Sequence, residues 1–368
     1  MRVLGFMSGT SLDAIDMAVI ETDGDTVSAL GPAGEAPLPE ELRELVLSAI
    51  GAGRRWERGA PEPNSFAEVS AQVADAHFEA ADAFLRANGL AWSDIDLIGF
   101  HGQTVLHEQP EPGRPGRTRQ LGDGARLSAR AGVPVAFDFR TADVAAGGHG
   151  APLAPVYHLA LARRSGLQPP TAVLNLGGVA NLTLIGADET MTALDTGPAN
   201  GLLDLWAELH GRGRFDADGA LALAGRVDAN TLERLMAHRY FARPAPKSLD
   251  RYDFDLGPVE HLSAEDGAAT LAAFTAEAVA LAMRQAGSAP AALIVAGGGR
   301  KNPAILRELS LRTRRPVMTA EAVGWRGDSV EAELFAFLAA RTARGLPISF
   351  PGTTGAPEPL TGGVVTTG

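Results

Sequence analysis

The pattern of apolar and polar positions opens with a predicted β-hairpin. An apolar run at residues 3–7 enters a turn of Ser, Gly and Thr, and a second apolar run at 15–20 leaves it. A third run at 26–30 continues the antiparallel meander. The hairpin tip offers small residues, hydroxyl groups and acids, which suits a phosphate chain and a divalent cation. An ordinary polar turn accounts for the same residues.

Further elements follow in the first half of the chain. Helical periodicity predicts helices at 39–50, 65–89 and 123–131. Short apolar runs predict strands at 97–100 and 134–137. The segments 51–64 and 109–119 are rich in Gly, Pro and Arg and are expected to be loops. So much glycine at 145–152 indicates close backbone approach or a hinge, and we place the domain junction near Pro155.

The second half repeats the opening pattern. Apolar runs at 172–176 and 180–185 flank Gly177 and Gly178, which suggests a duplicated domain. The strand at 292–295 leads into three glycines and is a plausible nucleotide site. Helices are expected at 200–210, 265–285, 302–312 and 328–344. We therefore predict an α/β protein with three segments: an N-terminal lobe 1–155, a C-terminal lobe 156–350 whose last helix packs back on the first lobe, and a loose tail 351–368.

Composition narrows the function classes. Of 368 residues, 45% are hydrophobic and 21% charged, as in ordinary soluble proteins, and the length favours two domains. The net charge of −12 argues against nucleic acid or an anionic membrane as a partner. Without cysteine there is no disulfide, thiol nucleophile or thiolate metal site. The first residues lack a leader pattern, and no run approaches 18 apolar residues, so a cytoplasmic protein is expected.

Several common nucleotide and hydrolase motifs are missing from the sequence. It contains no GxxxxGK[ST] motif, no GxGxxG after the first strand, and no HExxH or strand-borne GxSxG. The remaining candidate is a nucleotide site built from two similar glycine turns, one opening each half, with the triple glycine near the adenosine.

A series of motifs in order along the chain resembles the anhydro-N-acetylmuramic acid kinase family. These motifs are residues 5–16, 101–104, 120–124, 138–140, 143–152, 174–183, 195–200 and 297–302. The resemblance implies two duplicated actin/hexokinase-like (ribonuclease H-like) lobes, with mixed sheets flanked by helices and an interlobe cleft. It implies that ATP, Mg²⁺ and water serve to open the 1,6-anhydro ring of the sugar and phosphorylate O6 in cell-wall recycling. The implied partners are the sugar and ATP, with no nucleic acid or membrane, and a homodimer is compatible with the family.

The resemblance also implies roles for individual residues. Asp195 is the implied general base, which takes a proton from the attacking water; the alternative is a helix cap. Residues implied on the sugar side are His101, Arg140, Asn181 and Glu331. Residues implied on the ATP side are Gly9, Thr10, Ser11, Leu12, Asp13, Ala14, Ile15, Asp16, Gly177, Gly178, Gly297, Gly298, Gly299 and Asn302, with Asp13 as the metal ligand.

Alternatives stay open for several of these residues. Arg140 suits the lactyl carboxylate of the sugar or a phosphate, but an ion pair with Asp138 or Asp143 is the structural alternative. His101 is either a substrate contact or a structural histidine. Glu331 also completes a capping-box-like spacing. Asp16 is equally well explained as a solvated strand residue.

The sequence departs from the family pattern at three places. Ala14 and Ala199 replace glycines, which would resist a positive φ, and Leu249-Asp250 replaces Thr-Gly after Lys247-Ser248. Three other functions remain as alternatives, the last of them because of the alanines at positions 14 and 199. They are a kinase of the same fold that phosphorylates an ordinary hydroxyl, an ATP-driven conformational module, and a homologue that binds nucleotide without catalysis.

Overall fold

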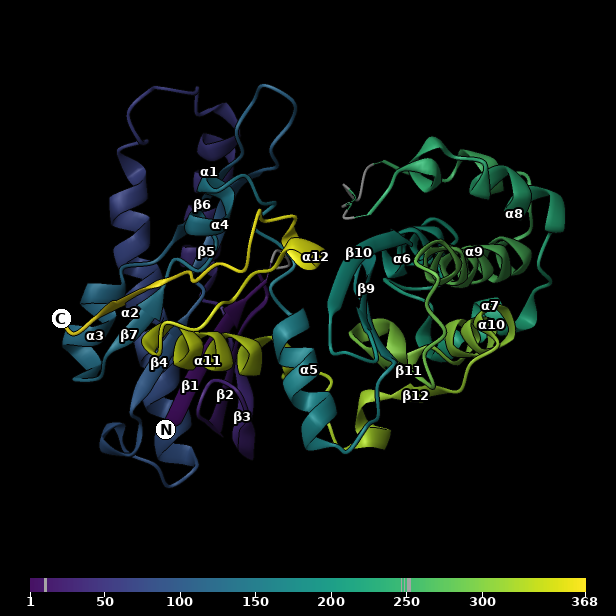
Figure 1. Cartoon of the computed structure of the whole chain (residues 1–368). Coiled ribbons are helices and arrows are strands. Elements are labelled where there is room, and N and C mark those ends of the chain that lie inside the picture. The colour runs from purple at the N-terminus through teal and green to yellow at the C-terminus, as the bar shows by residue number, and fades with distance from the viewer. Residues whose placement is uncertain (10–11, 246, 248, 250–252) are drawn as a thin grey trace. The chain divides into compact units, whose positions relative to one another are not determined.

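The chain divides into two compact units in the computed structural model, which describes all residues except 10, 11, 246, 248 and 250–252. The first unit joins Met1–Arg164 to Ser329–Gly368, and the second is Ser165–Asp328 (Figure 1). This division differs from the predicted boundaries at 155 and 350. The physical reason is that the helix α11 (Val330–Ala343) packs on strands of the first unit, as the pattern of the last helix had suggested.

The first unit contains a six-stranded mixed sheet with the order β13-β7-β4-β1-β2-β3. β2 is antiparallel to β1 and β3, whereas β1, β4 and β7 run parallel. The edge strand β13 pairs antiparallel with β7. The strands are β1 (Arg2–Ser8), β2 (Ala14–Thr22), β3 (Val27–Pro37), β4 (Leu97–Phe100), β7 (Val135–Phe137) and β13 (Val364–Thr366).

The second unit repeats this topology in a five-stranded sheet with the order β10-β9-β8-β11-β12. β9 is antiparallel to both neighbours, and β8, β11 and β12 run parallel. The strands are β8 (Thr171–Leu176), β9 (Val179–Ile185), β10 (Met191–Pro198), β11 (Leu293–Ala296) and β12 (Val317–Thr319). Both units therefore place their strands in the order 3-2-1-4-5 with the second strand reversed, which is the ribonuclease H-like arrangement. The predicted duplication is confirmed.

Helices cover both faces of the first sheet. Leu4 and Phe6 point to one face and join a core with α1, α2 and α3, while Gly5 between them points to the other. There α11 lies across β1 and β4 (Figure 1). Gly5 pairs with Gly99, and a Cβ on either would lie 2.0 Å and 2.1 Å from carbonyl oxygens of α11. The helices of this unit are α1 (Glu40–Arg55), α2 (Ser65–Ala87), α3 (Gly124–Ala131), α4 (Thr141–Ala145), α5 (Pro155–Arg164), α11 and α12 (Pro351–Thr354).

Replacing Gly99 by alanine is expected to destabilise the first unit strongly. The new Cβ would collide with the backbone of Phe335, and overpacking of this kind costs about 1–3 kcal/mol or more. The matched control is Gly51→Ala inside α1, where the Cβ meets only the flexible end of Arg55 and should stabilise by about 0.5–1 kcal/mol. Denaturant unfolding measures both variants. Equal stabilities would contradict the tight seating of α11.

The second unit is built around the long helix α9 (Ala264–Gln285). This helix is long and apolar enough to cross a membrane by length and composition, but 83% of its most apolar window is buried inside the protein. It packs on α7, α8, α10 and β10 as the central helix of an apolar core. The other helices are α6 (Asn200–Leu209), α7 (Ala220–Ala224), α8 (Ala229–Met236) and α10 (Pro303–Thr313).

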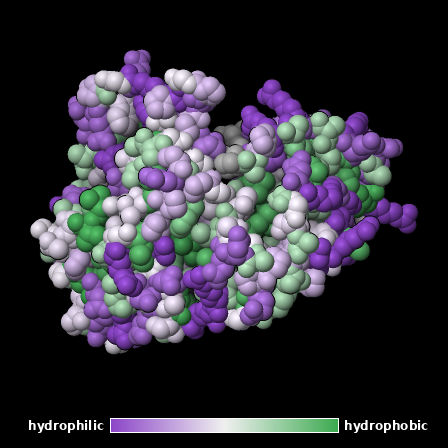
Figure 2. All heavy atoms as spheres, viewed as in Figure 1, coloured by the Kyte–Doolittle hydropathy of each residue, from purple (hydrophilic) through white to green (hydrophobic). Residues whose placement is uncertain are grey.

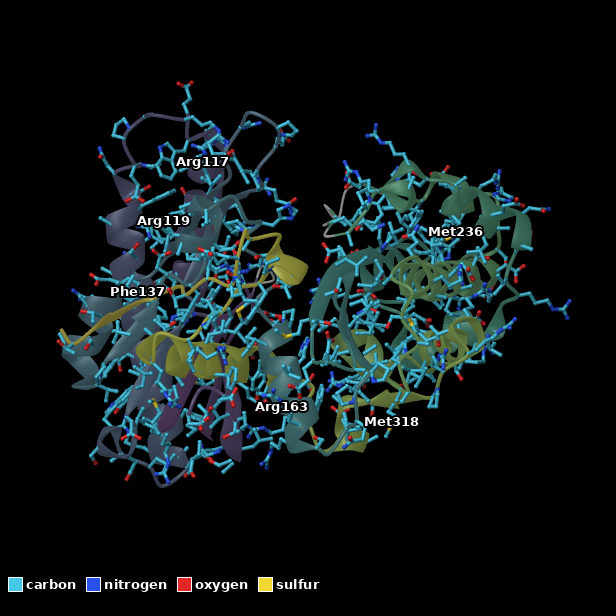
Figure 3. All side chains as sticks on the ribbon, in the orientation of Figure 1. Arg117, Arg119, Phe137, Arg163, Met236 and Met318 are labelled. Atoms are coloured by element: carbon cyan, nitrogen blue, oxygen red, sulfur yellow. The ribbon has the colours of Figure 1, made fainter. Side chains whose placement is uncertain are left out.

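Two predicted loops are partly ordered elements. The helix α1 runs on to Arg55, and segment 109–119 contains the start of β6 (Arg117–Leu121), which pairs with β5 (Gln103–Glu108). Arg117 and Arg119 extend from β6 (Figure 3) and form ion pairs with Glu108 and Glu62 at 2.9 Å and 2.5 Å. Ion pairs across the hairpin (Arg117 with Glu108) and to the segment before α2 (Arg119 with Glu62) accompany strand pairing in a stretch whose composition alone suggested a loop.

The predicted loose tail is also structured. Residues 351–354 form α12, and β13 extends the first sheet at its edge.

On the surface, hydrophilic residues alternate with small apolar areas in the view of Figure 2, as is usual for protein surfaces.

Candidate active site

In the first unit, the tip of the opening hairpin lies beside the polar motif that follows β4. Because β1 and β4 are parallel neighbours, their carboxyl ends meet at one edge of the sheet. The Ser8 hydroxyl donates to the Gly102 carbonyl at 3.4 Å, and the Gln103 amide donates to the Gly9 carbonyl at 3.4 Å. The structure thus brings together two motifs that lie about 90 residues apart in the sequence.

The predicted ATP-side residues of this hairpin differ in whether their side chains or only their backbone groups are accessible to a ligand. Leu12 and Ile15 are 2% and 1% exposed and belong to the core, so only their backbone is available to a ligand. Leu12 has a φ of 55°, a left-handed conformation that turns the chain back toward β2. Ala14 begins β2 with half-buried surface. Thr10 and Ser11 lie outside the described residues.

The carboxylates of Asp13 and Asp16 at the hairpin are suited to a magnesium ion that also binds the phosphates of a nucleotide. The Asp13 side chain is exposed, and its Oδ1 accepts from the Ala14 amide at 3.0 Å; Asp16 is half-buried on β2. In the described part of the chain, no three His, Cys, Asp or Glu side chains form a metal cluster. Mg²⁺ in kinases binds through one or two carboxylates plus substrate phosphates and water, so Asp13 matches the chemistry that such a site requires.

His101 and Arg140 form the polar centre of the first unit. The Nε and Nη2 atoms of Arg140 lie 3.3 Å and 3.2 Å from Nε2 of His101, and Nη1 donates to the Gly150 carbonyl at 2.7 Å. The His101 ring packs on Phe335 of α11 with centroids 4.5 Å apart. Glu331 precedes Phe335 by one helical turn, so its carboxylate lies on the same face of α11.

Burial and mutual charge set the ionisation of this group. Burial, together with the Arg140 charge, lowers the pKa of His101 well below its usual value, so the ring is neutral and Nε2 accepts from the guanidinium. Burial also lowers the pKa of Arg140 to about 10, against the opposing pull of Glu331 and Asp143. Desolvation raises the pKa of Glu331, and Arg140 counteracts it. Arg140 stays a cation at neutral pH.

The structural alternative for Arg140 is weak. Among the described residues, no ion pair joins Arg140 to Asp138 or Asp143. Asp138 accepts from the Thr141 hydroxyl, and the buried Asp143 carboxylate accepts from the Gly150 amide and a threonine hydroxyl instead. The capping alternative for Glu331 also lacks support, because the N-cap of α11 makes no side-chain capping bond. The Arg140 guanidinium is attracted by Glu331 and Asp143 but makes a direct ion pair with no carboxylate among the described residues, which suits an anionic ligand.

In the second unit, Asp195 lies in a row of polar residues that crosses three strands. Asn175 of β8 pairs with Asn181 of β9, which pairs with Asp195 of β10. Oδ1 of Asp195 accepts from the Asn181 amide at 2.8 Å, and Oδ2 accepts from the Leu249 amide at 2.9 Å. A β-bulge follows directly, between Asp195 and Gly197. Asp195 is therefore a strand residue, and the helix-cap alternative is wrong, since α6 begins after Ala199.

The surroundings of Asp195 favour a base. Burial raises the pKa of its carboxyl group, while the bonds from Asn181 and Leu249 oppose the shift. Its backbone is fixed as well, because the Tyr240 hydroxyl donates to its carbonyl at 2.6 Å and its amide donates to the Lys247 carbonyl at 2.9 Å. A carboxylate that accepts two hydrogen bonds, on a residue whose backbone is fixed by two more, and that is partly stripped of water is well suited to accept a proton.

Removal of the Asn181 amide should shift the pH dependence of the reaction. If Asp195 is the general base, the rate falls as its carboxylate becomes protonated, and the pKa raised by burial places this acid limb of the pH profile above that of a free aspartate. Asn181→Ala removes a bond that stabilises the carboxylate; the limb should move to higher pH by about one unit, since one unit is about 1.4 kcal/mol. A profile of kcat/KM against pH measures the shift. Exposed Asn230 on α8 supplies the control, Asn230→Ala, and a matching shift there would refute the assignment.

The glycine turns of the second unit meet at one sheet edge. Ala296 at the end of β11 pairs in parallel with Asn175 of β8, so the turns at 177–178 and 297–299 follow side by side. The carbonyls of Gly177 and Gly178 accept from the first amides of α6, which fixes the hairpin tip. Gly298 and Gly299 open a short 3₁₀ turn that Arg300 ties to the Gly297 carbonyl. The predicted ATP-side glycines are thus brought together, and their role stays a prediction.

Asn302 has a structural role that competes with its predicted one. Its Oδ1 accepts from the amides of Ala304 and Ile305 at 3.0 Å and 3.2 Å, which caps α10. Its Nδ2 faces the backbone and carboxylate of Asp216 at 3.5 Å. The side chain is 8% exposed, so its reach toward a nucleotide is limited.

The departures from the family pattern are accommodated locally. Neither Ala14 nor Ala199 has a positive φ; that of Ala199 is −125°. Leu249 serves Asp195 through its backbone amide, which any residue but proline supplies. Ser248 and Asp250 lie outside the described residues. Ala14, Ala199 and Leu249 are therefore compatible with the geometry described for Asp195.

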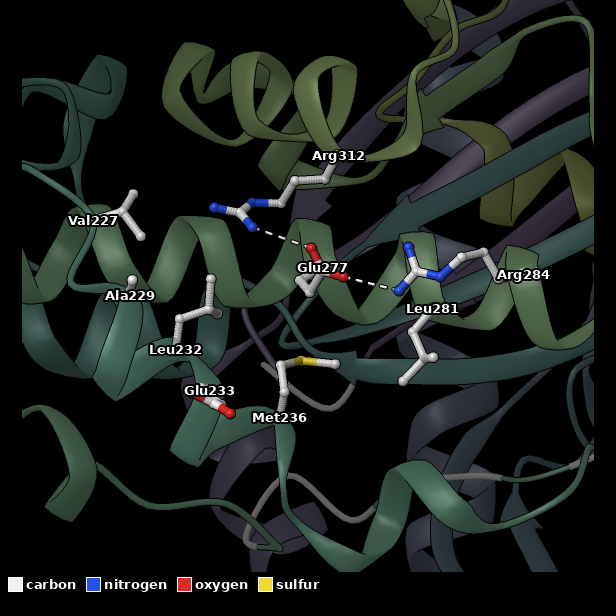
Figure 4. Close-up of a pocket in the computed structure, with 9 residues that line it drawn as sticks. All are labelled: Val227, Ala229, Leu232, Glu233, Met236, Glu277, Leu281, Arg284 and Arg312. Atoms are coloured by element: carbon white, nitrogen blue, oxygen red, sulfur yellow. Dashed lines mark hydrogen bonds and ion pairs between the residues drawn. The ribbon is translucent and has the colours of Figure 1, made fainter.

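A pocket of about 620 Å³ elsewhere in the second unit is not this site. It lies between α8 and α9. The charged residues at its rim pair with one another, because Glu277 accepts from both Arg284 and Arg312, at 2.9 Å and 3.1 Å (Figure 4). Met236 and Leu281 line its apolar part. None of the predicted site residues lines it.

Sequence reasoning missed the residues that hold the site together. Tyr240 and Lys247 fix the Asp195 backbone, and Asp143 holds the turn against which Arg140 rests, yet only Asp143 lay in a recognised motif. A lone tyrosine between two loops carries no periodic or motif signal. Phe335 could have been found, since it lies four residues after Glu331 on a helix.

The fold and these residues define a class of protein. Two units with the same ribonuclease H-like strand order, each with a glycine or polar turn at the tip of its first hairpin, are characteristic of the actin- and hexokinase-like proteins. The family model described as anhydro-N-acetylmuramic acid kinase matches residues 1–368. The chain belongs to the anhydro-N-acetylmuramic acid kinase family.

Close relatives carry the same name. A protein of Caulobacter vibrioides is 64% identical over 363 residues, covering 99% of this chain and 98% of the relative. A protein of Phenylobacterium zucineum is 60% identical over 363 residues, with the same coverage. Among proteins of known structure, xylulose kinase from Lactobacillus acidophilus is 11% identical with a TM-score of 0.49, covering 94% of this chain and 89% of that one. The last likeness is weak, and the fold assignment rests on strand order.

Proposed function

We propose that the protein is an ATP-dependent kinase that opens the 1,6-anhydro ring of anhydro-N-acetylmuramic acid with water and phosphorylates O6. The products are N-acetylmuramic acid 6-phosphate and ADP, formed during recycling of cell-wall fragments. Membership of the family supports the substrate, and the observation that carries the chemistry is Asp195, a partly desolvated carboxylate held on both oxygens.

In this proposal Asp195 acts as the general base. It accepts a proton from water as the water oxygen bonds to the anomeric carbon and the bond from that carbon to O6 breaks. O6 then bonds to the γ-phosphorus, and the bond from that phosphorus to the ADP oxygen breaks. Asn181 and the Leu249 amide keep the carboxylate oriented, since both donate to it. General base catalysis of this kind contributes about 10²–10⁴-fold.

The first unit would bind the anionic part of the sugar. Arg140 is a cation that makes no direct ion pair among the described residues, and its planar fork suits the lactyl carboxylate. Neutral His101 and the Gly150 carbonyl orient the guanidinium. Glu331, on the same face of α11 as Phe335, supplies a polar wall for the sugar.

The ATP phosphates would lie against the glycine turns. The predicted phosphate contacts are residues 9–16 of the opening hairpin and Gly177 and Gly178, and the turn at 297–299 would face the adenosine. Asp13 would hold a magnesium ion, which neutralises phosphate charge during transfer. We assign the protein to the cytoplasm, where ATP is available, and expect a homodimer, which light scattering would test.

Phosphorus NMR tests the proposal. With Mg-ATP and the anhydro sugar, a new phosphate monoester signal should grow at the rate at which ADP appears. With N-acetylglucosamine in its place, the monoester signal should stay small. ATP hydrolysis without a monoester signal would overturn the proposal in favour of a conformational ATPase.

A further inference from the structure

A buried aspartate organises the glycine-rich turn beside Arg140. Asp143 is 2% exposed, and its Oδ2 accepts from the Gly150 amide at 2.6 Å while its backbone carbonyl accepts from the Gly148 amide at 2.9 Å. A Cβ on Gly148 would lie 2.3 Å from that carboxylate, so only glycine lets the chain wrap so closely around Asp143. The run 147–150 is therefore a turn folded on one carboxylate.

The same turn carries the anchor of Arg140. The Gly150 carbonyl accepts from Nη1 of Arg140 at 2.7 Å, and the Gly150 amide is bound by Asp143. Gly150 is thus held on both sides, and its position sets the direction of the guanidinium. Since a bidentate contact depends on the plane of the fork, a small rotation of this peptide would misdirect it.

The second carboxylate oxygen of Asp143 contacts Thr354, in the C-terminal segment of the chain. Its Oδ1 accepts from the hydroxyl of Thr354 at 2.6 Å, and the Thr354 carbonyl accepts from the His149 amide at 2.7 Å. Thr354 is fully buried at the end of α12. Among the described residues no cation forms an ion pair with Asp143, although its charge attracts the nearby Arg140 guanidinium, so the hydrogen bonds to its carboxylate come from the Gly150 amide and the Thr354 hydroxyl.

We propose that Asp143 and Thr354 are positioning residues for recognition of the substrate carboxylate. They fix the turn 147–150 and, through the Gly150 carbonyl, the orientation of the Arg140 guanidinium. The inference rests on the proposed function for the identity of the anion. It gives the C-terminal segment a specific part in substrate recognition, which neither the family match nor the motifs assign.

The test compares three variants of the full chain. Thr354→Val removes only the hydroxyl and Thr354→Ser keeps it. Thr353→Val is the control, because among the described residues that hydroxyl bonds only to the backbone of Phe350, the N-cap of α12, and not to Asp143. Kinetics use the anhydro sugar and its carboxamide, which lacks the negative charge. Thr354→Val should raise KM for the acid about tenfold and leave KM for ATP and kcat within about twofold, as expected for one lost charge-assisted bond. The carboxamide should show little change, and Thr354→Ser should restore the wild-type values.

A second measurement does not depend on activity. Amide hydrogen exchange at Gly150 should be about tenfold faster in Thr354→Val and unchanged in Thr353→Val and Thr354→Ser, since Asp143 alone holds that amide. Equal losses for acid and carboxamide, or unchanged exchange at Gly150, would overturn the inference. If the wild-type protein phosphorylates neither sugar, the proposed function fails, and the exchange rates still decide whether Thr354 positions the turn.

Discussion

Asp195→Asn should lower kcat for the anhydro sugar by about 10²–10⁴-fold, with little change in KM. Asparagine keeps the shape of the side chain but cannot take a proton from water. Its hydrogen-bonding neighbours, Asn181 and the Leu249 amide, both donate to the carboxylate, so the loss should combine missing basicity with one repelled donor. Rapid quenching with separation of ADP and sugar phosphate measures the turnover.

The matched control lies on the same pair of strands. Asp188→Asn changes an exposed carboxylate in the turn between β9 and β10, where it bonds only to Thr190 among the described residues, and should leave turnover unchanged. If Asp195→Asn retained more than about a tenth of the wild-type kcat, another group would have to be the base.

Arg140→Ala should raise KM for the anhydro sugar by about 10²–10³-fold. Loss of one partner of a desolvated charge pair costs about 2–5 kcal/mol, and the lactyl carboxylate would lose its only cationic contact in this proposal. Arg140→Lys should recover only part of this loss, because an ammonium group cannot bind both carboxylate oxygens in one plane. Steady-state kinetics with each substrate varied separately measure the effect.

The control for Arg140 is another arginine of the same unit. Arg119→Ala removes a half-exposed ion pair with Glu62 on the β6 hairpin and should leave both KM values unchanged. A rise in KM for ATP with a constant KM for the sugar would assign Arg140 to a phosphate, the other anion that its chemistry fits.

The sequence predicted the architecture well because its signals were local or repeated. The apolar runs around Gly177 and the opening hairpin gave the duplication, and the strand order 3-2-1-4-5 in both units confirms it. The pattern at 328–344 indicated a helix, and α11 lies against Gly5 and Gly99 of the first sheet. The ordered tail was missed, because β13 and α12 depend on pairing with residues more than 200 positions away.

The sequence motifs named candidate chemical groups, whose roles stay predictions, but not the residues that position those groups. Motifs pointed to Asp195, Arg140 and His101, and the structure gives each of them a buried polar setting. Tyr240, Thr354 and the Leu249 amide act through single long-range hydrogen bonds, for which the sequence has no periodic signal. For Leu12 and Ile15 motif membership predicts ligand contact, and the structure limits that prediction to their backbone, since their side chains fill the core.

The central claim is that ring opening by water is coupled to phosphoryl transfer, and one measurement tests it most directly. The anhydro sugar is incubated with the protein and Mg-ATP in ¹⁸O-labelled water, and the product is analysed by mass spectrometry. The account predicts a product heavier than the substrate by one phosphoryl group and one labelled water, with the label on the anomeric carbon. A product that gains phosphate but no labelled oxygen, or ATP consumption with unchanged sugar, would contradict it.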